Sequence, residues 1–395
     1  MKIVINAVSA KMGGAVTYIT NVLHCLPPSE SGYEFHVFLP PETAEKQRDL
    51  PSSVRLFQAS AGHATWWKRI WWEQVTLRRW LKRGRAAFLF STANFAMFRC
   101  PVPQLLLVRI SVYFSRVYLE AFLPIHSFKT RVAFKFRRWL CCRSVRASDV
   151  LMTPTQAMLD DLRQFVEVVP QKALINPYGV VREESPVRGM GRTKPELAAA
   201  PLVVVRLIYV SLYSDHKNLG TLLKAMPLLN RIGAVGFLLR TTVDPAWEGA
   251  AWTVTHKDDL ALARQPDIAP WVEFLGPLQA GQVEELYRQG DVFVFPSLCE
   301  SFGHPMVEAM AHGLPIVASD TPVNREICGE AAVYFSALDP QDLAEKVNRL
   351  GRDRALREKL GAAGRRRAAV HFRWEDHVGR LLEAIEDSSS PRSGS

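Results

Sequence analysis

The chain has 395 residues, of which 48% are hydrophobic, and a formal net charge of +10 at pH 7. This length exceeds what a single hydrophobic core usually supports, so two domains are expected. No apolar run approaches the ~18 residues of a membrane-spanning helix, and the beginning of the chain does not resemble a secretory signal. The six cysteines lack the spacing of metal ligands, which favours reduced thiols in the cytoplasm.

The first half of the chain predicts a parallel α/β domain over residues 1–181. Apolar runs indicate strands at 2–7, 35–39, 88–90, 105–108 and 150–152. The first strand leads into Gly13 and Gly14, and a helix with apolar residues at helical spacing follows. Residues 182–200, rich in Glu, Pro, Gly and Arg, indicate a linker.

The second half begins a new set of strands after the linker, at 203–211, 235–239, 272–275, 292–295 and 316–318. Helices alternate with these strands, which favours two doubly wound parallel sheets. We therefore expect a second domain over residues 201–372. The Ser-, Pro- and Gly-rich residues 388–395 are expected to form a disordered tail.

Residues 291–320 place two carboxylates around the beginning of a short helix. The pattern predicts a buried strand over 291–296, a loop over 297–304 and a helix over 306–311. Pro305 suits the first helical position, and Gly313 can end the helix in a left-handed conformation. A further strand is expected over 315–319.

This arrangement suits a sugar nucleotide. A helix N-terminus offers free N–H groups and partial positive charge to a diphosphate. Ionised carboxylates accept hydrogen bonds from vicinal sugar hydroxyls, so Glu300 and Glu308 could hold two rings on either side of one phosphate site. The alternative is that both glutamates are ordinary solvated charges, and for an isolated pair that alternative is favoured.

The residues between and around the two glutamates reverse that preference. From Glu300 to Met310 the chain reads ESFGHPMVEAM. This stretch resembles the donor-binding motif E-x-F-G-x-P-x-x-E-A-M of the retaining glycosyltransferases of family 4. Residues 272–276 and 324–329, and the glycine pair near the N-terminus, are similar to further segments of the same family.

The resemblance implies the GT-B fold, in which two Rossmann-like domains face each other across a cleft and the final helix, over residues 373–387 here, crosses back to the first domain. It implies that Glu300 holds the donor sugar, that Glu308 holds the ribose, and that Lys217 and the backbone around Gly303 bind the diphosphate. Glu300 and Lys217 are thus the expected catalytic residues, although Lys217 could also be a solvated loop lysine. The remaining residues expected on the donor side are Gly13, Gly14, Ser211, Phe274, Leu275, Ser301, Phe302 and His304.

Two positions depart from the family pattern. Leu212 stands where many relatives have an arginine that pairs with the lysine on the phosphates. Arg109 follows the strand that usually ends in a histidine on the acceptor side. Arg109 could contact an anionic acceptor, or it could be a structural arginine at a strand end. No catalytic base can be named, and the front-face mechanism implied by the resemblance does not require one.

The implied activity is the transfer of a sugar from a UDP- or GDP-sugar to a glycan or lipid-linked acceptor, in the synthesis of a cell-surface polysaccharide or glycolipid. No metal or other cofactor is expected, because the sequence has no Asp-x-Asp pair and no His/Cys cluster. The alternative is a non-catalytic subunit that kept the fold and recruits partners or a membrane through its basic surface. The two altered positions favour this alternative, whereas the intact glutamate motif opposes it.

Cations and aromatic residues crowd residues 63–85 and 126–146. Basic helices with aromatic faces can lie on anionic membranes, so we expect peripheral binding to the inner face of a membrane. The alternative is that the aromatic rings face the core while the cations are solvated. A nucleic-acid surface would use the same charges, but no nucleic-acid motif accompanies them, so no nucleic-acid partner is expected.

Overall fold

The computed structural model describes residues 1–11, 13–63, 65–180, 203–231, 235–247 and 253–389. The expected linker over 182–200 and most of the expected tail lie outside these ranges. The chain divides into two compact units. Unit 1 comprises Met1–Phe114, Val132–Gly179 and Arg373–Ser395, and unit 2 comprises Ser115–Arg131 and Val180–Phe372.

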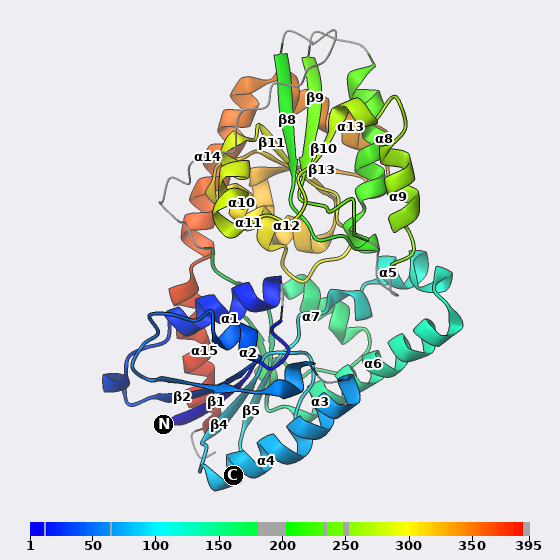
Figure 1. Ribbon diagram of the computed structural model, residues 1–395. Coiled ribbons are helices and arrows are strands. Elements are labelled where there is room, and N and C mark those ends of the chain that lie inside the picture. Colours follow the sequence, from blue (N-terminus) through cyan, green and yellow to red (C-terminus); the bar gives the residue numbers. More distant parts are fainter. Residues whose placement is uncertain (12, 64, 181–202, 232–234, 248–252, 390–395) are drawn as a thin grey trace. The chain divides into compact units, whose positions relative to one another are not determined.

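Unit 1 is built on a seven-stranded parallel sheet with the strand order β3-β2-β1-β4-β5-β6-β7. Its strands are β1 Lys2–Asn6, β2 Glu34–Leu39, β3 Val54–Gln58, β4 Phe88–Ser91, β5 Gln104–Leu107, β6 Val150–Thr153 and β7 Ala173–Ile175. The helices are α1 Gly14–His24, α2 Pro41–Ala44, α3 Trp66–Trp72, α4 Arg78–Arg83, α6 Phe128–Ala147, which begins in unit 2, α7 Gln156–Arg163 and α15 Trp374–Ser389. A π-helical turn, Glu73–Leu77, connects α3 to α4. Helices lie on both faces of this sheet (Figure 1), as in a doubly wound fold.

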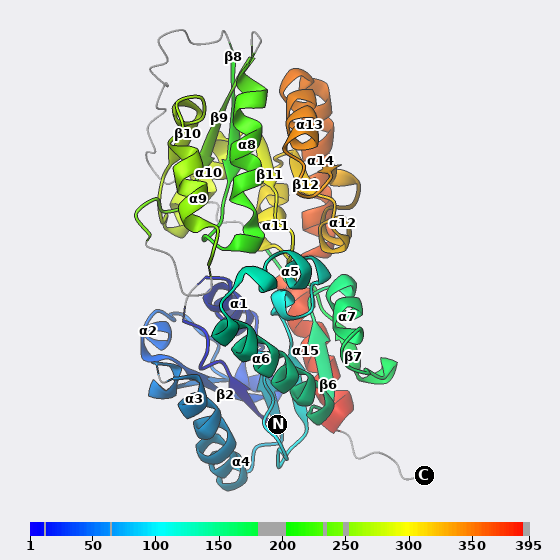
Figure 2. The same cartoon turned by 90° about the vertical axis from the view of Figure 1, so that its right-hand side faces the viewer.

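Unit 2 is built on a six-stranded parallel sheet with the order β10-β9-β8-β11-β12-β13. Its strands are β8 Val203–Tyr209, β9 Val235–Thr241, β10 Val272–Phe274, β11 Val292–Phe295, β12 Ile316–Ser319 and β13 Ala332–Phe335. Its helices are α5 Arg116–Ala121, α8 Leu219–Asn230, α9 His256–Ala263, α10 Ala280–Gln289, α11 His304–Ala311, α12 Pro322–Cys328, α13 Pro340–Arg352 and α14 Arg354–His371. The second view shows α8 and α13 on one side of this sheet (Figure 2).

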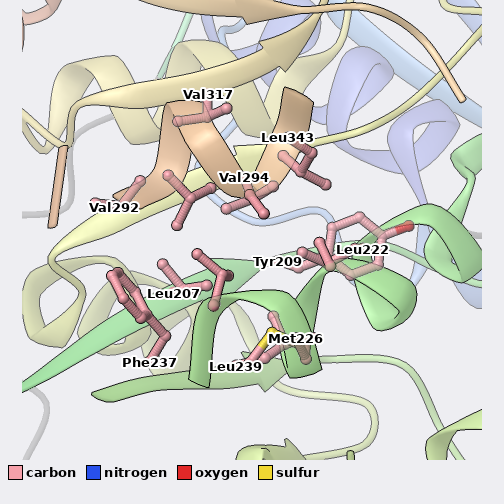
Figure 3. Close-up of a cluster of buried hydrophobic side chains, with 14 of the residues drawn as sticks. Leu207, Tyr209, Leu222, Met226, Phe237, Leu239, Val292, Val294, Val317 and Leu343 are labelled. Atoms are coloured by element: carbon pink, nitrogen blue, oxygen red, sulfur yellow. The ribbon is translucent and has the colours of Figure 1, made fainter. Parts of the chain in front are cut away.

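The core of unit 2 follows from the alternation of side chains along its strands. Val292 and Val294 point to the face that α8 and α13 cover. Phe293 and Phe295 point the other way, where the ring of Tyr287 on α10 lies 5.8 Å from that of Phe293. Because both faces are covered, these strands are continuous apolar runs. The core residues labelled in Figure 3 are Leu207, Tyr209, Leu222, Met226, Phe237, Leu239, Val292, Val294, Val317 and Leu343.

The expected fold class is confirmed: both halves contain a doubly wound parallel sheet. Every predicted strand is present, with boundaries shifted by at most two residues. Strands β3, β7 and β13 were not predicted, and each of them lies at an edge of its sheet. An edge strand pairs with only one neighbouring strand, and the residues of β3 and β7 are partly exposed.

The unit boundaries differ from the expected ones in two places. Residues 115–131 lie within the expected first domain, but in the structure they pack with unit 2. The last helix, α15, extends to Ser389, so residues 388 and 389 are helical and not part of a disordered tail. No helix within the described ranges combines the length and the apolarity needed to cross a bilayer.

Candidate functional site

The candidate site of unit 2 lies where its sheet changes winding direction. Strands β8 and β11 are neighbours in the sheet, although two other strands separate them in the sequence. In parallel sheets of this order, ligands bind outside the carboxyl ends of the strands at such a switch point. The loop after β8 carries Lys217, and the loop after β11 carries Glu300. The topology therefore brings these two residues to one edge of the sheet.

Lys217 and Glu300 form an ion pair in which the Lys217 ammonium donates to a carboxylate oxygen of Glu300. The Ser297 hydroxyl donates to the same oxygen over 2.7 Å. Their side chains are 21% and 10% exposed, so the pair is largely shielded from solvent. Burial by itself would raise the pKa of Glu300, but the charges of Lys217 and His216 and the two hydrogen bonds hold that pKa below its usual value. Glu300 is therefore an ionised acceptor, as sugar hydroxyls require.

The loop that carries Lys217 is held to the loop that carries Glu300. Asp215–Lys217 form a 3-10 turn, and Asn218 follows in a left-handed conformation as the N-cap of α8. The Asn218 side-chain amide donates to the Pro296 carbonyl over 3.1 Å, and the Leu298 N–H donates to the His216 carbonyl over 2.8 Å. These two hydrogen bonds fix the position of Lys217 relative to Glu300.

Glu308 lies on α11 and accepts a 2.8 Å hydrogen bond from the hydroxyl of Tyr287 on α10. Burial raises the pKa of its carboxyl and Glu284 raises it further, while the Tyr287 hydrogen bond acts in the opposite direction. Since Tyr287 is 21 residues away in the sequence, the motif could not reveal this contact. The bond fixes one carboxylate oxygen and leaves the other free to accept from a ligand in this geometry.

The ends of α11 explain two glycines of the motif. Gly303 is the N-cap at φ +83°, and a Cβ there would lie 2.5 Å from the Met306 side chain, so only glycine fits. The helix begins at His304, so Pro305 is its second residue, whereas the sequence predicted Pro305 at the first position. Both positions tolerate a missing N–H. At the other end Gly313 has φ +73°, and its N–H bonds to the Met310 carbonyl, as the sequence predicts for a left-handed helix end.

The other residues expected on the donor side differ in burial and in their hydrogen bonds. The ring of Phe302 is buried and packs against His304 and Phe372. The hydroxyl of Ser211 donates to the Leu212 carbonyl over 2.8 Å. Phe274, Leu275, Ser301 and His304 are partly exposed, at the end of β10 or around the beginning of α11.

In unit 1, Gly13 and Gly14 lie at the beginning of α1, which follows β1. Gly13 is the N-cap at φ 57° and ψ −148°, a conformation that an L side chain rarely adopts, and Gly14 begins the helix. Arg109 follows β5, and its guanidinium lies over the ring of Tyr18 with 5.7 Å between the guanidinium carbon and the ring centroid. The backbone N–H of Arg109 donates to the side-chain oxygen of Asn94 over 2.8 Å. Arg109 is thus held in place on unit 1, as either of its two expected roles requires.

The basic and aromatic segments divide into buried and exposed parts. Trp72 and Trp80 pack against Phe38, so they belong to the core, as the alternative interpretation held. Arg78 donates to the Phe98 carbonyl and is not a free surface cation. The large apolar side chains exposed on α3 and α6 are Trp67, Trp71, Phe128, Val132, Phe136 and Trp139, each at least 45% exposed.

Two glycosyltransferase family models match separate parts of the chain. The family model described as "Glycosyltransferase Family 4" matches residues 12–184, and the one described as "Glycosyl transferases group 1" matches residues 256–367. The O-antigen chain mannosyltransferase B of Escherichia coli is 27% identical over 181 residues, which are 45% of this chain and 45% of that protein. The matched part is less than two thirds of the length of this and the next curated relatives.

Solved structures extend the likeness over nearly the whole chain. A sucrose-phosphate synthase from Thermosynechococcus elongatus superimposes with a TM-score of 0.75 at 17% identity, covering 98% of both chains. Anabaena Alr3699/HepE, solved in complex with UDP-glucose, gives a TM-score of 0.66 at 17% identity and covers 98% of this chain and 100% of that one. At these identities the likeness shows the fold alone. The two family matches place the chain in glycosyltransferase family 4, and the structural likeness and the two parallel sheets show the GT-B fold.

Proposed function

We propose that the chain is a glycosyltransferase that moves a sugar from a nucleotide diphosphate sugar to a glycan or lipid-linked acceptor. The observation that carries the proposal is the Lys217–Glu300 ion pair at the switch point of the second sheet, next to the helix that bears Glu308. A cation, an ionised carboxylate and a helix N-terminus at this edge offer complementary partners to a diphosphate and a sugar.

The donor lies with its diphosphate against Lys217 and the N-terminus of α11, whose first N–H groups have no partner within the helix. Glu300 accepts hydrogen bonds from the sugar hydroxyls, and Glu308 accepts from the ribose. The end of β10, with Phe274 and Leu275, is the place for the base. The HepE structure was solved with UDP-glucose, which supports a uridine diphosphate sugar as the donor, and a guanosine diphosphate sugar is the alternative.

The reaction retains the configuration of the sugar and needs no divalent metal. The bond between the anomeric carbon and the leaving phosphate breaks while a bond to the acceptor oxygen forms on the same face. The proton of the acceptor hydroxyl passes to the leaving phosphate. Lys217 stabilises the negative charge that develops on that phosphate, and its pairing with Glu300 holds it in place before the donor arrives.

The activity is tested in two steps. Uridine, guanosine and adenosine diphosphate sugars are first screened for thermal stabilisation, since a ligand at 100 times its Kd stabilises the native state by about 2.7 kcal/mol. Nucleotide release is then measured with the donor found and with glycan and lipid-linked acceptors. Acceptor-dependent release is the expected result. The absence of stabilisation by any of the donors would refute the proposal.

A non-catalytic subunit is the second candidate function. The observation that favours it is Leu212, which is 62% exposed. It lies in the loop of residues 210–218 between β8 and α8, here called the donor loop, where many family members have a phosphate-binding arginine. A protein of this kind would bind a donor without turning it over. Stabilisation by a donor without nucleotide release with any acceptor would favour this candidate.

The protein also binds the cytoplasmic face of an anionic membrane in this proposal. Phe128, Val132, Phe136 and Trp139 are exposed on α6 at the spacing of one helix face. Exposed cations surround them, among them Lys129, Lys135 and Arg143. Aromatic rings can enter the lipid interface while the cations meet lipid phosphates, and a lipid-linked acceptor would lie on the same surface.

A further inference from the structure

One segment packs with unit 2 although it lies in the sequence between two strands of unit 1. Ser115–Arg131 follow β5 and precede β6, yet they cluster with unit 2. The segment begins with α5, whose N-cap Ser115 accepts the Tyr118 N–H over 3.4 Å. In both views α5 lies at the edge of unit 2 where β8 ends (Figures 1 and 2). This is the edge that carries the donor loop.

Two polar side chains of the segment, Tyr118 and His126, contact buried residues of the donor loop. The Nε2 atom of His126 lies 3.9 Å from a carboxylate oxygen of Asp215, and the two side chains are only 2% and 1% exposed. The Tyr118 hydroxyl lies 3.3 Å from the same nitrogen. The ring of Tyr118 also meets the ring of His216 edge-on, with 6.2 Å between the centroids.

Asp215 organises the backbone around the donor loop. Its carboxylate accepts hydrogen bonds from the N–H groups of Val254 and Thr255, at 3.0 and 3.1 Å, and from the Thr255 hydroxyl at 2.9 Å. Its carbonyl accepts the Asn218 N–H over 3.1 Å. A buried carboxylate is costly unless polar partners surround it, so its neighbours help to determine the loop conformation.

Lys217 is therefore held from two sides. On one side, the 297–300 loop bonds to the His216 carbonyl and to the Lys217 ammonium. On the other side, Tyr118 and His126 cover His216 and Asp215, the two residues that precede Lys217. Residues 115–131, from the first half of the chain, thus pack around the turn that carries Lys217, in the second half.

We propose that Tyr118 and His126 are positioning residues, which hold the Asp215–Lys217 turn in the conformation that presents Lys217 to the diphosphate of the donor. The role of Lys217 rests on the proposed function, whereas the support of the loop does not. Neither residue touches the substrate in this role. Because a misplacement of about 1 Å in a catalytic group can cost about 10²-fold in rate, loss of this support should lower turnover more than binding.

The test compares His126→Ala, His126→Gln and Tyr118→Phe with the wild-type full chain. We expect kcat for sugar transfer to fall about 10- to 100-fold in His126→Ala, with less than a threefold change in the Kd of the free nucleoside, which Glu308 holds. His126→Gln keeps a donor that can reach Asp215, so it should recover most of kcat. Tyr118→Phe removes only the hydroxyl, and a smaller loss of kcat is expected.

His36→Ala is the matched control. His36 is also buried beside a carboxylate, with its Nε2 atom 2.6 Å from Glu34, but it belongs to unit 1. This variant should lose stability without a change in kcat at a temperature where it remains folded. If His126→Ala and His36→Ala lose kcat, nucleoside affinity and stability in the same proportions, His126 is only structural and the proposal is overturned.

A second measurement does not depend on activity. Amide hydrogen exchange without donor should show faster exchange at Lys217, Asn218, Val254 and Thr255 in His126→Ala, recovery in His126→Gln and no change in His36→Ala. Unchanged exchange in His126→Ala would overturn the proposal. If the wild type binds no nucleotide sugar, the proposed function fails, and the exchange data still decide whether the segment supports the loop.

Discussion

The Glu300→Gln substitution tests the ion pair on which the candidate site is built. It keeps the shape of the side chain but removes the charge that Lys217 and Ser297 contact. Exposed ion pairs contribute about 0.2–1 kcal/mol, whereas breaking a buried one costs about 3–5 kcal/mol. With side chains 21% and 10% exposed, this pair lies between the two classes, and we expect a loss of about 1–3 kcal/mol in the free energy of unfolding.

The pH dependence of this loss has a defined sign. Although burial opposes it, the surrounding charges and hydrogen bonds lower the pKa of Glu300 in the folded protein. A carboxyl with a lowered pKa contributes stability that is fully present above its ordinary pKa and is lost as the pH falls through the folded-state value. The stability difference between the wild type and Glu300→Gln should therefore be largest at neutral pH and shrink in acid.

Thermal unfolding and turnover of the same variant are measured together. Each kcal/mol should lower Tm by about 2–4 °C for a unit of this size. Turnover should fall by at least ~10²-fold, comparable to losing one polar contact to a transition state. Lys217→Met and the double variant complete a double-mutant cycle, in which the two substitutions should be less than additive. Near-normal turnover with a bound donor, or additive losses of stability, would refute the reasoning.

The remaining predictions concern the ribose, the metal and the membrane. Glu308→Ala should weaken the binding of the free nucleotide by at least tenfold in calorimetry. Because burial raises the pKa of Glu308, this carboxyl is protonated at a higher pH than an ordinary one, and the nucleotide affinity of the wild type should begin to fall at that higher pH on acidification. In Glu308→Gln, nucleotide affinity should no longer depend on pH in this range. Chelation of divalent ions should leave turnover unchanged, and activity restored only by added Mg²⁺ or Mn²⁺ would show that the mechanism is wrong. Replacing Arg79, Lys82 and Arg83, which are exposed on α4, with serine should reduce binding to anionic vesicles without changing donor affinity.

The membrane prediction has a matched control on α14. Changing its exposed cations Arg354, Lys359 and Arg366 to serine removes the same charge from unit 2. Vesicle binding by this control should stay close to that of the wild type, and binding by the wild type should weaken as salt increases. Equal loss in both variants, or equal binding to anionic and neutral vesicles, would contradict a surface on unit 1.

The strands that could be predicted from the sequence are those buried on both faces. β11 and β12 are uninterrupted apolar runs because helices cover both sides of the sheet. The edge strands β3, β7 and β13 were not predicted; each has partly exposed residues, and a charged residue interrupts the apolar pattern of β3. The edge strand β10 was predicted, and residues 272–276, which include it, are similar to a segment found in the family.

In the site, too, the residues of one local motif could be predicted, whereas contacts between residues distant in the sequence could not. Glu300, Gly303 and Glu308 lie in one motif, and the local rules for a loop and a helix N-terminus place them correctly. The contact of Tyr287 with Glu308, and that of His126 with Asp215, join residues far apart in the sequence and depend on how the helices pack. Nothing in the sequence indicated that residues 115–131 pack with unit 2.

The most direct test of the central claim is calorimetric titration of the best diphosphate sugar into the wild type and into the Glu300→Gln, Glu308→Ala double variant. Lys217 remains in both proteins, so any difference in affinity is due to the loss of the two carboxylates. We predict one binding site per chain in the wild type and affinity at least tenfold weaker in the double variant, with both proteins folded. Equal affinity in the two proteins, or no binding of any uridine, guanosine or adenosine diphosphate sugar to the wild type, would contradict the account.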